Sequence, residues 1–562
     1  MQPSGYQRKL QRKTALWVER SSWDSHWREI AQYQMPRASR FQTSDVNRGQ
    51  KKHNHILDNT AIYAHRTLAA GMMSGMTSPA RPWFRLALQD RDMMESAPVR
   101  QWLHDAAALM RAVFSASNTY QALHQCYGEL GAFGTWADFV MPDYDNVVHH
   151  YPLTVGEYAI STNDKGRVDT IVREYKMTVG QMVKQFGRNK CSVPIRNLYD
   201  RGALDDWVDV IHMVEPRSDY DRTKRDNLNM PFASCYFEPA KANWDQFLSE
   251  SGFKRFPALC PRWEVTGNDV YGHSPGMECL GDVKQLQHEQ LRKSQAIDYQ
   301  VNPPLQVPTA YKDQASKRIP GGVMYVDQNG PGGGIRSAYD VNVRLDYLLE
   351  DIRDTRERIN TAYYADLFLM LANQPANGRM TATEVAERHE EKLLMLGPVL
   401  ERLHNELLSP LIDITFDRLA DAGVLPPAPP ELEGVDLEIE FISTLAQAQR
   451  AVAAAGSDRL LGTVGTLVNT WPEVRHKIDA MQVIDGYAEM FGVDPKFISP
   501  DEVAKEKAAA EARAAQAAQQ GMAAAQAVDS AKTASEINPD GMRDVLGMFQ
   551  GYNSPTPLET AL

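Results

Sequence analysis

The chain has few cysteines for its 562 residues, and the five that it has are scattered, at Cys126, Cys191, Cys235, Cys260 and Cys279. No Cys-x-x-Cys pair occurs, which argues against a zinc ribbon, and the odd number argues against a disulfide framework. The pattern therefore indicates reduced thiols in a cytoplasmic environment.

Long hydrophobic runs are also absent. The best candidate lies in "LAAGMMSGMTSPARPWFRL", where 14 uncharged residues separate Arg66 from Arg81. A helix that spans a bilayer needs roughly 20 apolar residues. The sequence therefore predicts no membrane span in this stretch.

The same stretch is predicted to form a soluble helix over residues 56–77. Gly71 and Gly75 are four residues apart, so they share one face of that helix. A face without side chains lets another backbone approach closely. We therefore expect a buried helical joint, which Pro79 ends and a strand from Trp83 follows.

Motifs of a catalytic centre are missing. The chain contains neither the phosphate-binding loop G-x-x-x-x-G-K-[ST] nor the nucleophile elbow G-x-S-x-G. The glycine cluster at 330–334 lacks the spacing of a dinucleotide-binding loop. The His-Glu pairs at His288 and His389 lack the second histidine of a zinc protease. We therefore predict no catalytic residues, no cofactor and no metal site.

Positive charge is in deficit overall, because the formal net charge is −12. That balance argues against a protein that grips nucleic acid over a broad surface, although not against one that lets it pass. Residues 1–52 are an exception, with 11 Lys and Arg against 4 Asp and Glu, interleaved with Trp17, Trp23 and Trp27. Two interpretations stay open for this segment: an arm that binds an acidic partner or a nucleic-acid backbone, or an amphipathic helix packed by its tryptophans.

Residues 150–265 are predicted to form a mixed α+β body. Strands over 157–161 and 168–177 flank the turn at 163–166, which is a hairpin signal. A short helix over 178–187 and strands over 207–214 and 233–237 follow along the chain. One further strand is predicted much later, at 436–442, after a proline-rich linker.

Two long helices are predicted over 278–300 and 341–371, with a Pro- and Gly-rich insert at 301–340 between them. The first is too polar for a core helix, which suits a helix flanked by similar neighbours. A loop over 372–380 ends the second.

A third long helix follows from 381, and we expect Pro398 and Pro410 to kink it. Near the C-terminus, about half of the residues from 504 to 534 are alanine, which predicts one more helix.

Five blocks carry a resemblance to a known family: "LDNTAIYAHRTLAAGMMSGMTSPARPWFRL" (57–86), "REYKMTVGQMVKQFG" (173–187), "YGHSPGMECLGDVKQLQ" (271–287), "NPPLQVP" (302–308) and "MTATEVAERHEEKLLMLGPVLERL" (380–403). In this order they resemble the head-to-tail connector, or portal, proteins of short-tailed, podovirus-type bacteriophages. The resemblance covers roughly residues 17–421, and the C-terminal residues beyond do not add to it.

The resemblance implies a structural protein and not an enzyme. Such a protein forms a ring, usually of about twelve subunits, at one vertex of the capsid, where double-stranded DNA is packaged and ejected through its channel. The implied partners are other copies of the chain, the major capsid protein, the packaging terminase and the tail adaptor protein, with no membrane. The implied location is the virion, after assembly in the host cytoplasm.

The expected fold class is α+β, as an elongated portal-type subunit whose parts map onto the predicted elements. The wing takes 1–277 and 381–490, the two stem helices take 278–300 and 341–371, and the Pro/Gly-rich clip takes 301–340. The channel (tunnel) loop takes 372–380, and the crown or barrel helix with its tail takes 491–562.

Two sets of residues are candidate contact sites. In the channel loop, Asn373, Gln374, Asn377 and Arg379 are expected to touch DNA phosphates weakly and release them. The alternative for this set is an ordinary surface loop without DNA contact. On the second stem helix, Arg353, Asp354, Arg356, Glu357 and Arg358 are candidates for contacts between subunits. The alternative for the second set is a solvated face with pairs inside the helix, such as Glu350–Arg353 and Asp354–Arg358.

Two other functions fit the sequence less well. A packaging-associated nuclease or ATPase would need a clustered metal set or a phosphate-binding loop. A membrane-active ejection protein would insert the alanine-rich segment into a bilayer, but Lys505, Glu506 and Lys507 at its start argue against insertion.

Overall fold

A computed structural model describes residues 4–36, 55–90, 96–224, 226–239, 246–301, 345–372, 395–432 and 437–446 except 444. It also describes shorter pieces at 38, 40–41, 93, 305–306, 336–337, 434–435, 461–467, 471 and 482–484, and parts of 504–526. The chain divides into two units, 1–89 with 102–470 and 90–101 with 471–562. In the second unit, most described residues between 504 and 522 are helical, as the alanine-rich composition predicts.

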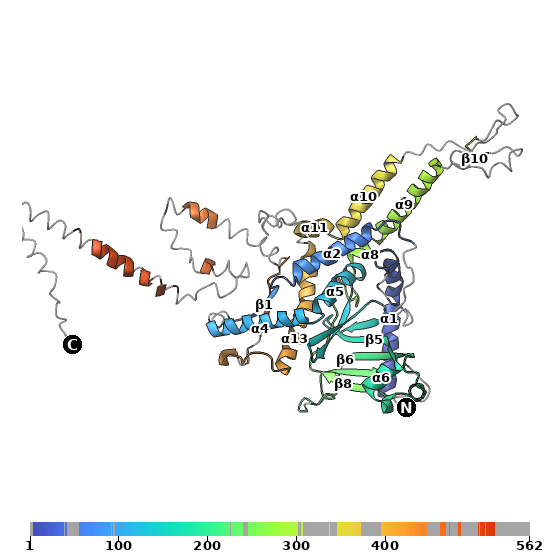
Figure 1. Ribbon diagram of the computed structural model, residues 1–562, viewed down its shortest axis with the longest axis horizontal. Helices are drawn as coiled ribbons and strands as arrows, with labels where there is room; N and C mark the ends of the chain where they lie inside the picture. The colour runs from blue at the N-terminus through green and yellow to red at the C-terminus, as the bar shows by residue number, and fades with distance from the viewer. Residues whose placement is uncertain are drawn as a thin grey trace, which may run out of the picture. The chain divides into compact units, whose positions relative to one another are not determined.

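A five-stranded antiparallel sheet forms the body of the first unit (Figure 1). Its strands follow one another in space as they do in sequence: β4 Tyr158–Thr162, β5 Val168–Thr178, β6 Trp207–Pro216, β7 Phe232–Phe237 and β8 Ser249–Phe253. The predicted hairpin is confirmed, because the Asn163 side chain accepts hydrogen bonds from the backbone N–H groups of Lys165 and Arg167. Gly166 completes the turn with a φ of 71°, which glycine adopts without strain.

Short helices cover one end of this sheet. Helix α6, Val179–Phe186, begins at a capping box in which Thr178 accepts the N–H of Gln181, and α7 spans Val193–Asp200. The helix predicted over 178–187 is therefore confirmed. Together with the 3-10 turn Arg188–Lys190, these helices enclose a small separate core with β6.

Helix α1, Gly5–Tyr33, lies along the five-stranded sheet and agrees with the packed-helix interpretation for the described part of the N-terminal segment. Trp27 is fully buried and donates from Nε1 to the Phe133 carbonyl at 3.1 Å. Lys9 and Lys13 pair with Glu215 and Glu174 of the sheet. Residues 5–33 are therefore a packed helix with its tryptophans toward the core, and two of its lysines are paired within the subunit.

A smaller sheet and a buried helix lie next to this body and were not predicted from the sequence. The sheet has the order β3-β2-β9, with β2 Ala137–Asp143, β3 Val147–Leu153 and β9 Ala258–Leu259. Helix α5, Thr119–Phe133, is buried over most of its length. A helix buried on all sides has no polar face, so the 3.6-residue alternation that reveals a surface helix is weak in it.

Helix α2, Thr60–Met76, is the buried joint predicted from the two glycines. It packs closely against α11, Ala365–Ala372, and α5, and side chains fill the space directly over both glycines. A Cβ on Gly71 would overlap Phe368, and a Cβ on Gly75 would lie 2.7 Å from Cδ1 of Leu445. The predicted strand after Pro79 is β1, Phe84–Leu88.

Strand β1 pairs antiparallel with β12, Leu437–Phe441, with Phe84 opposite Phe441. Each strand was predicted, but their pairing joins segments more than 300 residues apart along the chain. Between them in sequence, α4 spans Ala97–Ala116, and the 3-10 turn Pro430–Leu432 lies in the proline-rich linker.

The first long helix is confirmed: α8, Pro275–Glu278, leads into α9, Leu280–Val301. The second is not continuous over 341–371, because α10, Asp346–Ala362, ends before α11, Ala365–Ala372. Tyr364 between them has a φ of 53°, in the left-handed region that interrupts a right-handed helix. Most of the insert at 301–340 lies outside the described residues, except for the paired strands β10 Leu305–Gln306 and β11 Arg336–Ser337.

The third long helix is described from residue 395 onward. It contains a π-helical turn, His404–Leu408 (η4), and then continues as α13, Ser409–Asp421. The irregularity directly precedes Pro410, whose missing N–H removes one helical hydrogen bond. The helix is thus irregular just before Pro410, with a π turn that ends two residues earlier, whereas residues 395–403 around Pro398 are regular helix; the kinks at both prolines stay predictions.

Candidate functional site: the stem and its root

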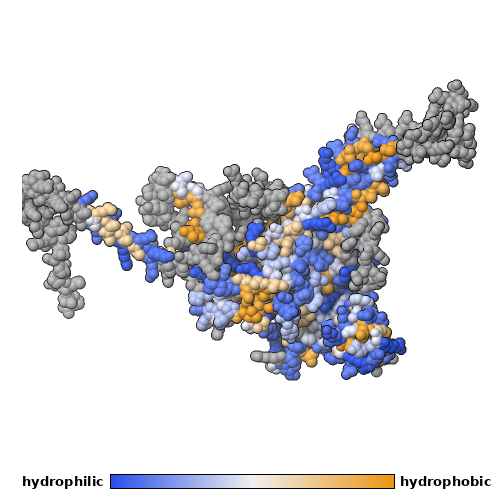
Figure 2. Space-filling model, viewed as in Figure 1, coloured by the Kyte–Doolittle hydropathy of each residue, from blue (hydrophilic) through white to orange (hydrophobic). Residues whose placement is uncertain are grey.

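Helices α9 and α10, here called the stem, lie side by side and project from the five-stranded sheet's unit (Figure 1). Large apolar side chains face solvent on both helices: Leu291, Tyr299 and Val301 on α9, and Tyr347 and Leu349 on α10. Val301 is 80% exposed and Tyr347 69% exposed. Figure 2 shows hydrophobic residues along the stem, so this helix pair leaves apolar surface uncovered within one subunit.

The stem root is the cluster of Asp58, Gln287, Gln290 and Arg356, where both stem helices meet the start of α2. The Asp58 carboxylate is buried and accepts hydrogen bonds from Arg356 Nη2 at 2.7 Å and from Gln290 Nε2 at 3.0 Å. Thr60 donates to it as well, from its backbone N–H at 2.8 Å. Burial alone would raise the pKa of Asp58, but the hydrogen bonds from Thr60 and Arg356 outweigh burial and lower it.

Gln287 joins the chain before α2 to helix α9. Its side-chain oxygen accepts the backbone N–H groups of Leu57 and Asp58 at 2.6 and 2.8 Å. Its amide nitrogen donates to the Asp58 carbonyl at 3.0 Å. One glutamine therefore satisfies three backbone groups at a buried position, which explains why a polar residue stands on the inner face of α9.

The predicted charged residues of α10 divide into two groups. Arg356 belongs to the stem root, and Arg358 reaches Asp282 of α9 at 3.5 Å and Asp354 of its own helix at 3.7 Å. Arg353 and Glu357 are exposed, and in the described part of the chain no ion pair involves either of them. The Asp354–Arg358 pair is thus present, whereas the Glu350–Arg353 pair is not found among the described residues.

A second buried contact lies at the far end of α10. The Tyr363 hydroxyl donates to Gln34 Oε1 at 2.5 Å, and Gln34 Nε2 donates to the Gly276 carbonyl at 2.9 Å. A side chain on Gly276 would collide with both partners, since its Cβ would lie 2.6 Å from Gln34 Oε1 and 2.8 Å from the Tyr363 hydroxyl. The break between α10 and α11 is therefore held at a fixed point against α1 and α8.

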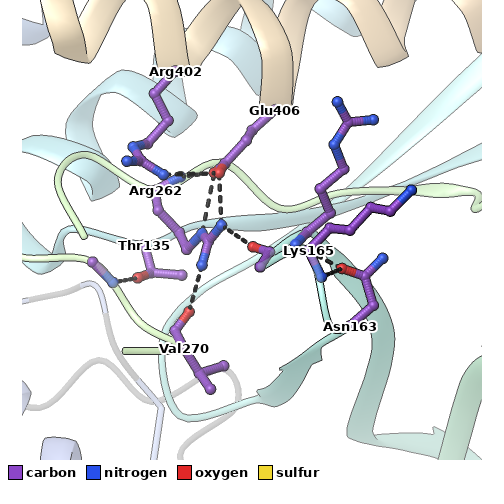
Figure 3. A network of polar contacts seen from close by, with 10 residues as sticks. Thr135, Asn163, Lys165, Arg262, Val270, Arg402 and Glu406 are labelled. Carbon is purple, nitrogen blue, oxygen red and sulfur yellow. Dashed lines mark hydrogen bonds and ion pairs between the residues drawn. The ribbon is translucent and has the colours of Figure 1, made fainter. Parts of the chain in front are cut away.

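Arg262 connects the third long helix to the sheet (Figure 3). It is 3% exposed, and its guanidinium donates from Nη2 to Glu406 Oε1 and to the Gly166 carbonyl, both at 2.7 Å. Arg402, one helical turn before Glu406, donates to the same carboxylate at 3.2 Å. Glu406 lies in the π turn, so this irregular turn presents the carboxylate that Arg262 and Arg402 share.

The predicted channel-loop residues Asn373, Gln374, Asn377 and Arg379 lie outside the described residues. Helix α11 ends at Ala372, directly before them.

The sequence also gave no direct indication of Asp58, Gln287, Arg262 or Glu406 as contact residues. The one available signal was local: Asp58 stands two residues before Thr60, a spacing at which an aspartate side chain bonds the backbone N–H.

Sites of other classes are not seen in the part of the chain that the structure describes. Among those residues, no three His, Cys, Asp or Glu side chains are placed to hold a metal ion. Of the helices described, none is both long and apolar enough to span a bilayer.

The fold and the stem define an α+β structural subunit of the portal type, in which helices project from a sheet-based body. The chain belongs to the family of bacteriophage head-to-tail connecting proteins, because the model described as "Bacteriophage head to tail connecting protein" matches residues 7–498. The match extends beyond the residues that carried the resemblance in the sequence.

Two relatives support the same family. The chain is 55% identical to the probable portal protein of Bordetella phage BPP-1 over 546 residues, which cover 97% of this chain and 98% of that protein. It is 46% identical to the portal protein of Salmonella phage epsilon15 over 535 residues, covering 94% and 95% of the two chains. The C-terminal part of the chain is therefore shared with these relatives.

Solved structures of gene transfer agent particles are also similar to this chain. A chain in the virion of a native particle matches with a TM-score of 0.30 and 12% identity, covering 71% of this chain and 89% of its own length. A chain in the neck of an empty particle matches with a TM-score of 0.34 and 11% identity, covering 75% and 90%.

Proposed function

We propose that this chain is the portal, or head-to-tail connector, of a bacteriophage and that its copies form the ring at one capsid vertex through which double-stranded DNA is packaged and ejected. Membership of the connector family supports this role directly. A connector is a structural component of the virion, associated with capsid and tail. The family gives no support to a packaging nuclease or ATPase, or to a membrane-active ejection protein.

The single structural observation behind the ring is the uncovered apolar surface of the stem. A helix pair with side chains such as Tyr347 and Val301 in water leaves a surface that association can bury. In a closed ring each stem packs between two others, so the surface of one copy is covered by a different surface of the next. The exposed Arg353 and Glu357 are then available for contacts between neighbouring stems.

The finer assignments extend this proposal. The ring has about twelve subunits, and it binds the major capsid protein, the packaging terminase and the tail adaptor protein after assembly in the host cytoplasm. The wing, clip, channel loop, crown and first stem helix take the ranges given by the sequence analysis. The second stem helix ends earlier, at the break after Ala362. The chain has no catalytic activity of its own, and Arg379 of the channel loop touches the passing DNA.

Native mass measurement tests the ring. Twelve copies of a 63.1 kDa chain amount to about 760 kDa, and electron micrographs of the same sample should show rings with a central hole. A stable monomer or dimer under native conditions would refute the proposal.

A stem variant adds a second test. Tyr347→Glu places a charge on the uncovered surface and should reduce assembly. Tyr144→Glu is the matched control, because Tyr144 is fully exposed on the turn between β2 and β3, away from the stem. Equal loss of rings in both variants would show that the stem surface has no special role.

A further inference from the structure

An open pocket of about 260 Å³ lies between the turn that follows α2 and one face of α4. It is lined by Pro79, Arg81 and Pro82 from the turn, by Arg111 and Ser115 from α4, and by Tyr120 from α5. The polar residues among them are two arginines, a serine and a tyrosine. No carboxylate is among the residues that line it.

Arg111 is the central group of this pocket. Its side chain is half-buried, and its contacts within the subunit are weak: Nη1 donates to the Phe84 carbonyl at 3.4 Å, and the guanidinium lies 5.9 Å from the centre of the Phe84 ring. Burial lowers the pKa of Arg111 from its ordinary value. In the part of the chain that the structure describes, no Asp or Glu pairs with it, so its desolvation is not balanced by an opposite charge.

Arg81 adds a second positive charge from an exposed position on the same pocket wall. Two arginines in the lining of one small pocket bring guanidinium donors near a single bound group, with Ser115 and Tyr120 beside them. Guanidinium groups match carboxylates and phosphates in geometry, often through two parallel hydrogen bonds. The pocket therefore has the chemistry of an anion site.

We propose that this pocket binds a carboxylate side chain of the neighbouring copy of this chain; the inference rests on the proposed ring. The chain has 72 Asp and Glu against 60 Lys and Arg, so each copy offers carboxylates in excess. Contacts in a ring join two different patches, and an uncompensated arginine pocket on one copy is complementary to an acidic side chain on the next. Duplex DNA engages many phosphates along a surface, and two recessed arginines supply few of the charges that such binding needs.

The test compares arginine variants of the full-length chain in ring assembly. Arg111→Gln removes the charge, Arg111→Lys keeps the charge without the guanidinium, and Arg81→Gln changes an exposed residue whose loss leaves the fold intact. The matched control is Arg201→Gln, an exposed arginine at the end of α7. Mass photometry over a series of protein and NaCl concentrations gives the subunit concentration at which half of the chain is in rings.

We expect that concentration to rise about tenfold for Arg111→Gln, less for Arg111→Lys and Arg81→Gln, and not at all for Arg201→Gln. The salt dependence of assembly should also weaken in the Arg111 and Arg81 variants, because a screened charge pair has been removed.

Three results would overturn the inference. If the parent forms rings and Arg111→Gln and Arg81→Gln form them equally well at every salt concentration, the pocket has no role between subunits, while the proposed function stands. If the variant rings form normally but retain less DNA, the ligand is a phosphate and the carboxylate assignment is wrong. If the parent itself forms no rings, the proposed function fails and this inference fails with it.

Discussion

Replacing Gly71 by alanine should destabilise the protein, although the same change usually stabilises a helix. Gly71 lies in the middle of α2, where Ala is favoured over Gly by about 1 kcal/mol in an exposed helix. Here the new methyl group would overlap the Cβ, Cγ and Cδ1 atoms of Phe368 in α11. Those atoms include the root of the side chain, so a rotation of the ring alone does not make room.

The magnitude follows from two opposing contributions. Phe368 is only 1% exposed, so it cannot move into solvent without losing its buried contacts. An extra methylene in a well-packed core costs about 1–3 kcal/mol. Three Phe368 atoms would lie within 2.5 Å of the added Cβ, so the upper end of this range applies. After the helix-propensity gain of about 1 kcal/mol is subtracted, we expect a net loss of about 2 kcal/mol in the free energy of unfolding.

Gly281 provides the matched control. It lies near the start of α9, and a Cβ at that position would have no atom within 4 Å. Gly281→Ala should therefore be neutral or stabilise by up to about 1 kcal/mol. Urea unfolding under identical conditions should show a lower free energy of unfolding for Gly71→Ala and an equal or higher one for Gly281→Ala.

The double variant Gly71→Ala with Phe368→Leu makes the test specific. If steric overlap is the cause, the two substitutions should be less damaging together than the sum of each alone, because they act at one contact. A Gly71→Ala protein as stable as the parent, or additive effects in the double variant, would refute the packing of α2 against α11 as the reason for this glycine.

Three other predictions concern charge. Glu129, fully buried in α5, has its pKa raised to about 8 by burial, so its own contribution to stability is complete below about pH 4.5 and is lost as the pH rises through 8, by as much as about 5 kcal/mol. Glu129→Gln should flatten that slope in urea unfolding measured between pH 5 and 9. Glu406→Gln leaves the buried Arg262 without its carboxylate and should cost about 3 kcal/mol in the same assay. Arg379→Ala should leave ring assembly intact and alter the packaging or retention of DNA in a complementation assay.

Each of these has its own control. A parent protein whose stability does not change between pH 5 and 9 would show that Glu129 does not titrate as its burial requires. Glu401→Gln, an exposed change on the same helix as Glu406, should cost little, and an equal loss in both would contradict a special role for Arg262. Normal packaging and retention by Arg379→Ala rings would remove Arg379 from the channel loop's function.

Several elements could be predicted from the sequence because their signals are local. The hairpin of β4 and β5 follows from alternating residues around an Asn-x-x-Gly turn, and α9 follows from apolar residues on one side of a polar helix. The order of the five blocks was sufficient to identify the connector family, since it depends on sequence similarity and not on how the chain packs.

The contacts that hold the stem could not be predicted, because they join residues far apart along the chain. Arg356 and Asp58 are separated by 298 positions and Arg262 and Glu406 by 144. From the sequence, each of these residues is indistinguishable from an ordinary surface charge. Its partner is determined only when α10 and the π turn pack against other elements.

The break at Tyr364 also separates what local sequence signals predict from what long-range contacts determine. Helix propensity and apolar spacing both favour a continuous helix from 341 to 371, and nothing in the local sequence stops it. At the point where the helix ends, the buried Tyr363 hydroxyl is bound to Gln34, which follows α1 and lies 329 positions away along the chain. The sequence by itself determined the family, the first stem helix and the strands β1, β4, β5, β6, β7 and β12, whose signals lie within a few residues. Tertiary packing decided which side chains are buried against one another, because only there does a charge or a hydroxyl lose its water and require a specific partner.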